Sequence, residues 1–176
     1  MSQILDQKSN SLSFEEVLEQ TGRLIYRNQG DSMWPLIREG KDILVITAKP
    51  EGRLKRYDVP LYRRDCDRLA GSGKYVLHRI LRVTPEGYLI SGDNRWNIER
   101  DITDRHIVGV LTAVIRGGAD PKVANPRTIY VTDRAYRIYT HLWCDLFPLR
   151  AILFWLRDLP GRALRYLRRR RGVRRG

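Results

Sequence analysis

Short runs of β-branched and other apolar residues, each bounded by turn-forming residues, make up most of residues 43–115 of this 176-residue chain. Such runs are typical of β-strands, because branched side chains pack well on a pleated surface. They predict a mainly β domain. Pro60, inside the run Val59–Tyr62, predicts an edge strand or a bulge there. The other predicted strands are Ile43–Thr47, Tyr75–Val83, Gly87–Ile90 and Ile107–Ile115.

A short helix is predicted before the strands. Ser13 and Glu16 have the Ser-x-x-Glu spacing of a capping box, in which each side chain satisfies a free amide at the helix start. One apolar face of the helix is then predicted from Phe14, Val17, Leu18, Leu24 and Ile25. Thr21-Gly22 predicts the point where this helix is interrupted.

Three polar residues stand in the order hydroxyl, imidazole, carboxylate. Ser32 lies in Gly-Asp-Ser-Met-Trp-Pro, His78 in Tyr-Val-Leu-His-Arg-Ile, and Asp93 in Ser-Gly-Asp-Asn. In an activated serine the imidazole takes the hydroxyl proton, and the carboxylate fixes the imidazole tautomer and stabilises its cation. The three residues therefore predict a serine nucleophile with its base and acid.

The segments around these residues resemble a known superfamily of serine proteases, which contains the signal peptidases and the self-cleaving SOS-type repressors. Ser-Met-x-Pro, His-Arg-Ile and Gly-Asp-Asn occur in the family order, and the similarity spans residues 30–116, about half of the chain. The resemblance implies a peptidase domain of coiled antiparallel β-sheets, with Ser32 beside a groove for an extended peptide. It also implies a preference for small apolar residues before the cleaved bond.

The general base separates the branches of this superfamily. His78 stands where the archaeal and endoplasmic-reticulum-type signal peptidases have histidine and the bacterial leader peptidases have lysine. An ordinary imidazole, with a pKa near ~6.5, is mostly neutral at pH 7. Three acids compete to orient this imidazole: Asp93 is ranked first, Asp101 second and Glu99 third. Gly-Asp-Asn is also a sequence that favours a turn. The alternative for Asp93 is therefore a purely structural role, in which its side chain hydrogen-bonds the backbone of that turn.

One position departs from the family pattern. Membrane signal peptidases have a serine two residues before the nucleophile that helps to hold the oxyanion, and this chain has Gly30. Backbone amides around Ser32, in the segment that includes Asp31 and Met33, are expected to take over that role, with Gly30 allowing close approach of the substrate. Loss of one oxyanion donor costs roughly 10²–10³ in rate, so a slow or narrowly specific enzyme is expected.

The composition predicts neither a metal site nor a cofactor. The three histidines, His78, His106 and His141, have no ligand spacing, and Cys66 and Cys144 are the only cysteines. Two lone cysteines are more often free thiols than a disulfide, although a Cys66–Cys144 bond is left open.

The net charge of +13 is concentrated at the C-terminal end, where residues 157–176 hold nine arginines and one aspartate. Such a tail suits any acidic surface, including nucleic acid. No helix-turn-helix pattern or aromatic stacking platform accompanies it, so nucleic acid is not the expected partner.

The segment Ile138–Leu156 contains fourteen apolar residues in nineteen, interrupted by Asp145, Pro148 and Arg150. Two charges near the middle argue against a membrane span. Tryptophan and phenylalanine among arginines favour helices that lie on an anionic membrane surface, as a removable module outside the active site. The alternatives are packing on the domain or on a second copy.

These features give four regions: 1–29, a polar segment and helix; 30–118, the peptidase domain; 119–137, a linker; and 138–176, an amphipathic, Arg-rich helical region. Residues 1–29 hold no signal peptide or long apolar run, so a cytoplasmic enzyme is expected, associated with the inner membrane face through its C-terminal region. The predicted function is cleavage of a precursor or leader peptide by Ser32 and His78. The alternative is an inactive binding module whose basic tail contacts membrane or nucleic acid.

Overall fold

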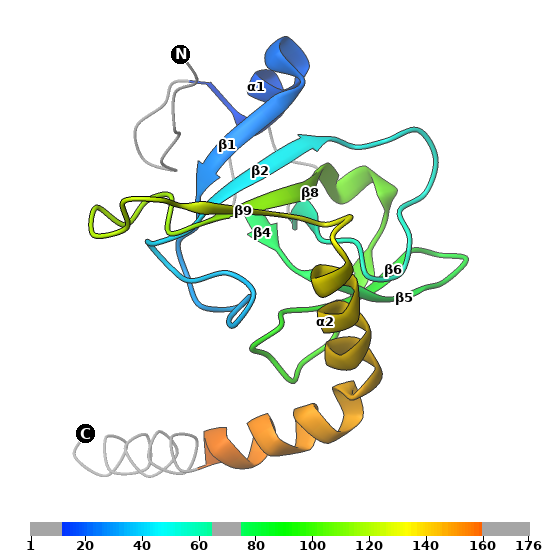
Figure 1. Cartoon of the computed structure of the whole chain (residues 1–176). Helices are drawn as coiled ribbons and strands as arrows, with labels where there is room; N and C mark the ends of the chain where they lie inside the picture. The colour runs from blue at the N-terminus through cyan, green and yellow to red at the C-terminus, as the bar shows by residue number, and fades with distance from the viewer. Residues whose placement is uncertain (1–11, 65–74, 160–176) are drawn as a thin grey trace, which may run out of the picture.

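The strands form two antiparallel sheets in a mainly β structure, as the sequence predicts (Figure 1). The structure is a computed structural model that describes residues 12–64 and 75–159. The larger sheet has the order β1-β2-β8-β3-β4, with β9 also paired to β8, and the smaller sheet has the order β5-β6-β7. The strands are β1 (Arg23–Arg27), β2 (Ile43–Ala48), β3 (Pro60–Arg63), β4 (Tyr75–Leu77), β5 (Arg79–Val83), β6 (Tyr88–Ser91), β7 (Glu99–Ile102), β8 (Ile107–Arg116) and β9 (Arg127–Tyr130).

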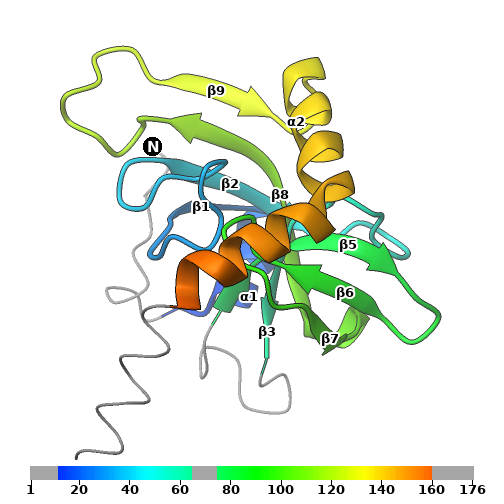
Figure 2. The same cartoon turned by 90° about the horizontal axis from the view of Figure 1, so that it is seen from below.

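The long strand β8 organises the larger sheet, because it pairs with β2, β3 and β9. The pairing register shifts at Val45/Ile46 in β2 and at Leu61/Tyr62 in β3, and such irregularities increase local bend and twist. The sheet is accordingly curled into a half-barrel (Figure 2). Pro60 opens β3, which lies between β8 and β4, so the edge-strand alternative is wrong. The pairing with β8 is irregular after Leu61, but the extra residue there is Val108 of β8 and not a residue of the Pro60 strand.

The predicted strand Tyr75–Val83 is two strands that belong to different sheets. β4 pairs with β3 in the larger sheet, and β5 pairs with β6 in the smaller one. His78 is the single residue between them. The chain therefore changes sheets at the imidazole, which lets residues 78 and 79 face different surroundings.

The N-terminal helix α1 (Phe14–Thr21) forms where the capping box predicts it, but it ends before Leu24 and Ile25, which lie on β1. The capping box of Ser13 and Glu16 is present, and Gly22 ends the helix in the left-handed conformation with φ of 68°. Phe14 and Leu18 are buried against the larger sheet in the main hydrophobic core. A second cluster, which includes Tyr62, Ile80 and Ile90, joins the two sheets.

The segment predicted as a linker, 119–137, contains regular structure. Strand β9 lies inside it and pairs with β8, and helix α2 (Arg134–Asp145) begins before residue 138. Likewise β1 precedes the predicted boundary at residue 30 but pairs with β2 in the same sheet. Both flanks therefore belong to the larger sheet and extend the domain beyond residues 30–118.

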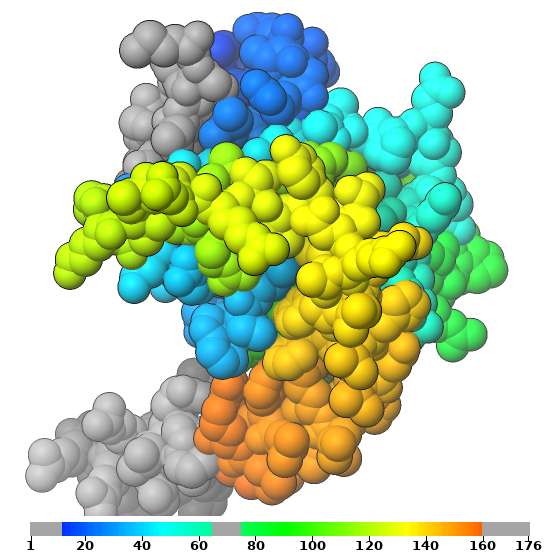
Figure 3. Space-filling view, in the orientation of Figure 1, coloured from blue at the N-terminus to red at the C-terminus, as the bar shows by residue number. Residues whose placement is uncertain are grey.

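Two C-terminal helices complete the described chain. After α2, a turn at Leu146 leads into a helix over residues 147–159, and the chain bends between the two (Figures 1 and 2). In the space-filling view these helices form one end of the molecule (Figure 3). Over residues 12–64 and 75–159, the helices are too short or too polar to cross a membrane.

Candidate active site

Ser32 and His78 line the same pocket, which has a volume of about 240 Å³. The pocket lies where the loop after β1 meets β4, and Leu61, Val76 and Leu77 give it an apolar wall. Arg64 and Arg95 also line it. The fold thus brings together the hydroxyl and the imidazole that the sequence singled out, although they are far apart in the chain.

The Ser32 turn is held by contacts on both sides. Gly30 has φ of 110°, a conformation that L side chains rarely adopt, and its amide donates to Glu39 Oε1 at 2.6 Å. Met33 is fully buried in the main core. The carbonyl of Ser32 accepts from the amide of Asn94 at 2.8 Å. The half-buried Ser32 side chain therefore stands on a turn fixed by the core and by the 92–95 loop.

The amides of Ser32 and Met33 have no hydrogen-bond partner within the described ranges. They are the backbone donors closest in sequence to the proposed nucleophile. Unused amides at such a turn suit an oxyanion, because they need not break another bond to bind it. The amide of Gly30, by contrast, is already engaged by Glu39.

His78 is oriented by Glu99. The Nδ1 atom of the buried imidazole lies 2.9 Å from Glu99 Oε1 and 3.1 Å from the Tyr62 hydroxyl. Tyr62 donates to the same Glu99 oxygen at 2.8 Å, and Arg64 binds both carboxylate oxygens at 2.8 Å. Glu99 is therefore the centre of a four-residue network that ends on the imidazole.

This network keeps Glu99 ionised. Burial by itself would raise the pKa of Glu99, but hydrogen bonds from His78, Arg64 and Tyr62 outweigh it and hold that pKa well below the ordinary value of 4.5. Burial and the neighbouring Glu99 charge raise the pKa of the Tyr62 hydroxyl, so Tyr62 remains a proton donor. The hydrogen bond to Glu99 raises the pKa of the Arg64 guanidinium.

An ionised carboxylate fixes the tautomer of the imidazole. Because Glu99 can only accept, Nδ1 of His78 carries a proton, so in the neutral imidazole the lone pair is on Nε2. Nε2 lies near the turn that holds Ser32: a Cβ built on Gly92 would lie 3.1 Å from this nitrogen and 2.5 Å from the Ser32 carbonyl oxygen. Within the described chain, the Ser32 hydroxyl makes no hydrogen bond, to Nε2 or to any other group.

Gly92 is a site residue whose role the sequence analysis missed. A side chain there would collide with the backbone of Ser32, so only glycine lets the 92–95 loop approach the nucleophile turn. The signal was present in the Gly-Asp-Asn motif, where the glycine was interpreted as part of a turn. Its role is close approach between two backbones.

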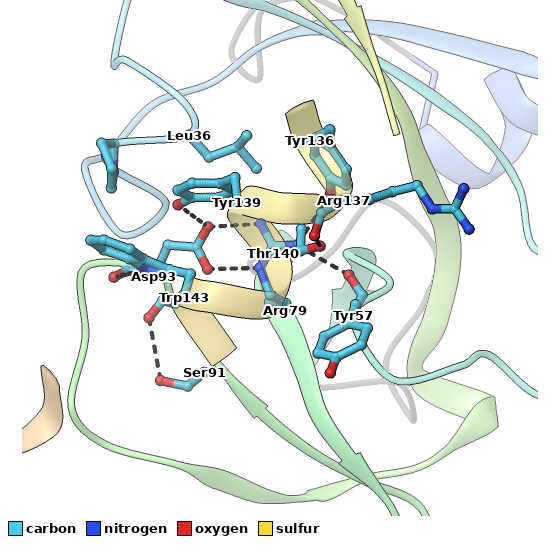
Figure 4. A network of polar contacts seen from close by, with 12 residues as sticks. Leu36, Tyr57, Arg79, Ser91, Asp93, Tyr136, Arg137, Tyr139, Thr140 and Trp143 are labelled. Carbon is cyan, nitrogen blue, oxygen red and sulfur yellow. Dashed lines mark hydrogen bonds and ion pairs between the residues drawn. The ribbon is translucent and has the colours of Figure 1, made fainter. Parts of the chain in front are cut away.

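Asp93, ranked first as the acid for His78, has a different partner. Its two oxygens bind Nε and Nη2 of Arg79, both at 2.8 Å, and Tyr139 donates to Oδ2 at 2.9 Å (Figure 4). The Arg79 and Asp93 side chains are 0% and 1% exposed. Burial would lower the pKa of Arg79, but the Asp93 charge outweighs it and raises that pKa. The acid ranking is thus corrected: Glu99 contacts the imidazole, and Asp93 neutralises Arg79.

Asp101, ranked second, is exposed on β7 and has no polar partner in the described structure. It follows Glu99 by two residues in the same strand. Glu99 reaches the imidazole because its strand pairs with β6 opposite Ile90, next to the His78 sheet change.

The C-terminal helices hold the loop that follows β6. Trp143 Nε1 donates to the Asp93 carbonyl at 2.9 Å, the buried Arg150 also donates to this carbonyl, and Arg157 donates to Asn94 Oδ1 at 2.9 Å. Asn94 in turn binds Ser32. The expectation of a removable module outside the site is therefore wrong in its second part, because the helices contact the loop that supports the nucleophile.

The remaining candidate ligands stay apart. Over the described residues, no cluster of three or more His, Cys, Asp or Glu side chains could hold a metal ion. Cys144 is a free, buried thiol whose pKa burial raises to about 11, and Cys66 lies outside the described residues.

Comparisons with protein-family models, with curated proteins and with solved structures find no significant match to this chain.

Proposed function

We propose that this protein is a serine endopeptidase of the signal-peptidase-like type, with Ser32 as nucleophile, His78 as general base and Glu99 as the acid that orients the base. One observation carries the proposal: His78 and Ser32 line one pocket, Nδ1 of the imidazole is hydrogen-bonded to the half-buried Glu99 carboxylate, and Nε2 lies near the Ser32 turn. This is the relation of base and orienting acid that activates a serine hydroxyl.

The chemistry follows from these positions. Nε2 of His78 takes the hydroxyl proton as Ser32 Oγ attacks the peptide carbonyl carbon, and Glu99 stabilises the resulting imidazolium. The free amides of Ser32 and Met33 are the candidates to bind the oxyanion. The imidazolium then gives its proton to the leaving amine, and water, deprotonated by the same nitrogen, hydrolyses the acyl-enzyme.

An extended peptide is the substrate that fits best. Strand β4 lies at one end of the larger sheet and its residues Tyr75–Leu77 line the pocket, so a peptide can add to this strand through main-chain hydrogen bonds. The apolar wall of Leu61, Val76 and Leu77 suits a small apolar side chain near the cleaved bond. A precursor or leader peptide with such a residue before the cleavage point is the proposed substrate class.

The test is cleavage of a proteome-derived peptide library by the purified protein, with new termini identified by mass spectrometry. We expect a narrow set of cleavages that falls at least ~10⁴-fold in rate in Ser32→Ala and in His78→Ala. The double variant should be no worse than either single one, because nucleophile and base act as a unit. Cleavage that persists in both single variants would refute the assignment. Peptide capture without cleavage by the wild-type chain would favour the binding-module alternative.

A further inference from the structure

The two C-terminal helices carry apolar residues on opposite faces. The inner face packs on the domain, where Tyr136 and Cys144 are buried. The outer face carries a continuous stripe at spacings of three and four residues, and each member is 49–61% exposed. We call it the outer stripe: Ile138, Leu142, Leu146, Leu149, Leu153 and Leu156.

The outer stripe cannot be buried by rotating the helices. Tyr139, Trp143 and Arg150 bind Asp93 from the inner face, and Arg150 also lies over the rings of Trp143, Phe147 and Phe154 at 4.9–5.6 Å. Rotation would break these contacts and expose the Arg79–Asp93 pair. A row of leucines this long is unusual on a bare surface and marks an interaction site.

The charged residues around the outer stripe indicate what binds to it. Residues 157–176 hold nine arginines and one aspartate, immediately beyond the end of the stripe, and Arg134 and Arg137 are exposed near its start. Asp145, the acidic residue beside the stripe, is paired with Arg56 at 2.7 Å. An anionic lipid surface satisfies both the leucines and the arginines. Arginines flank both ends of the stripe, so two copies packed stripe to stripe would bring like charges together in either orientation, which is electrostatically unfavourable.

We propose that the outer stripe docks on an anionic lipid bilayer, with the helices lying in the interface and the basic residues against the head groups. The inner face continues to hold the 92–95 loop in the docked state, so the pocket keeps its structure at the membrane. This proposal is independent of the proposed peptidase activity, because it concerns only the helix surface and its charge.

The experiment is co-sedimentation of the full chain with vesicles of phosphatidylcholine alone and with one third phosphatidylglycerol. We expect binding to the anionic vesicles, a drop of roughly tenfold or more for Leu149→Gln/Leu153→Gln, and no change for Tyr130→Ser. Tyr130 is the matched control because it is 55% exposed but lies on β9, away from the stripe. Raising the salt concentration should weaken binding without abolishing it, since apolar burial is not screened.

A second measurement covers the case of a poorly folded variant. Trp155 is 42% exposed beside the stripe, so anionic vesicles should shift tryptophan emission of the wild-type chain to the blue, and Trp155→Phe should lose most of that shift. Vesicle binding that is unaffected by the leucine substitutions would overturn the proposal in favour of the basic tail alone. Concentration-dependent dimers that vanish in the leucine variant, without vesicle binding, would overturn it in favour of a second copy.

Discussion

His78 and Arg79 are neighbours in the chain, yet each meets its own carboxylate in a different environment. His78 contacts Glu99 at the wall of the pocket, where Arg64 remains half exposed, whereas Arg79 and Asp93 are sealed beneath α2. A guanidinium keeps its proton in proteins, while an imidazole gains and loses one. Glu99 is therefore the carboxylate that can serve proton transfer, and Asp93 is the one that holds the fold together.

The change of sheets at His78 produces this separation. β4 ends at Leu77 and β5 begins at Arg79, so the two side chains leave the backbone into different surroundings. The imidazole lies among residues of β3 and β7, and the guanidinium among Tyr57, Tyr136 and Asp93. One residue of irregular backbone thus directs two adjacent basic side chains to two different carboxylates.

The largest expected effect tests the contact between His78 and Glu99. Glu99→Gln should lower the peptidase rate by up to ~10⁴-fold, because the amide can stabilise the wrong imidazole tautomer and no longer balances the imidazolium charge. The rate is measured on a peptide cleaved by the wild-type protein. Asp101→Asn, two residues away on the same strand and exposed, is the matched control and should leave the rate unchanged. Equal effects of the two substitutions would remove Glu99 from the proposed machinery.

The second prediction tests the buried pair. Arg79→Ala should lower the free energy of unfolding by about 3–5 kcal/mol, because it leaves the Asp93 carboxylate buried without its partner. Urea unfolding followed by circular dichroism measures the change. Arg82→Ala, an exposed arginine on the same strand, should change stability by less than ~0.5 kcal/mol. A loss of activity in Arg79→Ala at unchanged stability would contradict the structural role of the pair.

The smallest expected effect is on the stability of the protein at low pH. Since the folded-state pKa of Glu99 is depressed, its ionised form stabilises the protein above about pH 4.5, and this contribution is lost as pH falls below that value. The stability difference between wild type and Glu99→Gln should therefore shrink between pH 6 and pH 3, by at most about 1.4 kcal/mol per pH unit. Urea unfolding at several pH values measures it. A difference that stays constant with pH would mean that Glu99 is not held ionised by its neighbours.

The sequence was informative about elements and about the two central residues of the site. The β-branched runs predicted β2 and β8, the capping box predicted α1, and the motif flanks picked out Ser32 and His78. These features depend on local chemistry, which a sequence displays directly. Whether the two residues perform catalysis stays a prediction until the variants are measured.

The orienting acid could not be chosen in the same way. Asp93 and Glu99 are six residues apart, and only the pairing of β6 with β7 and the change of sheets at His78 decide which one reaches the imidazole. Tyr62 in β3 and Arg64, just after the end of that strand, both bind Glu99, but that relation is visible only once β3 is placed. The contact of Glu99 with His78 depends on long-range strand pairing, which single residues in the sequence do not reveal.

The cover over the Arg79–Asp93 pair is also the last part of the described chain to be made. A protein is synthesised from its N-terminus, so a nascent chain that has reached residue 120 holds Ser32, His78 and Glu99, but Tyr136, Tyr139 and Arg150 have yet to follow. Until they arrive, water reaches the buried ion pair and the 92–95 loop lacks its support. The pocket therefore gains this support only after the two C-terminal helices have been synthesised.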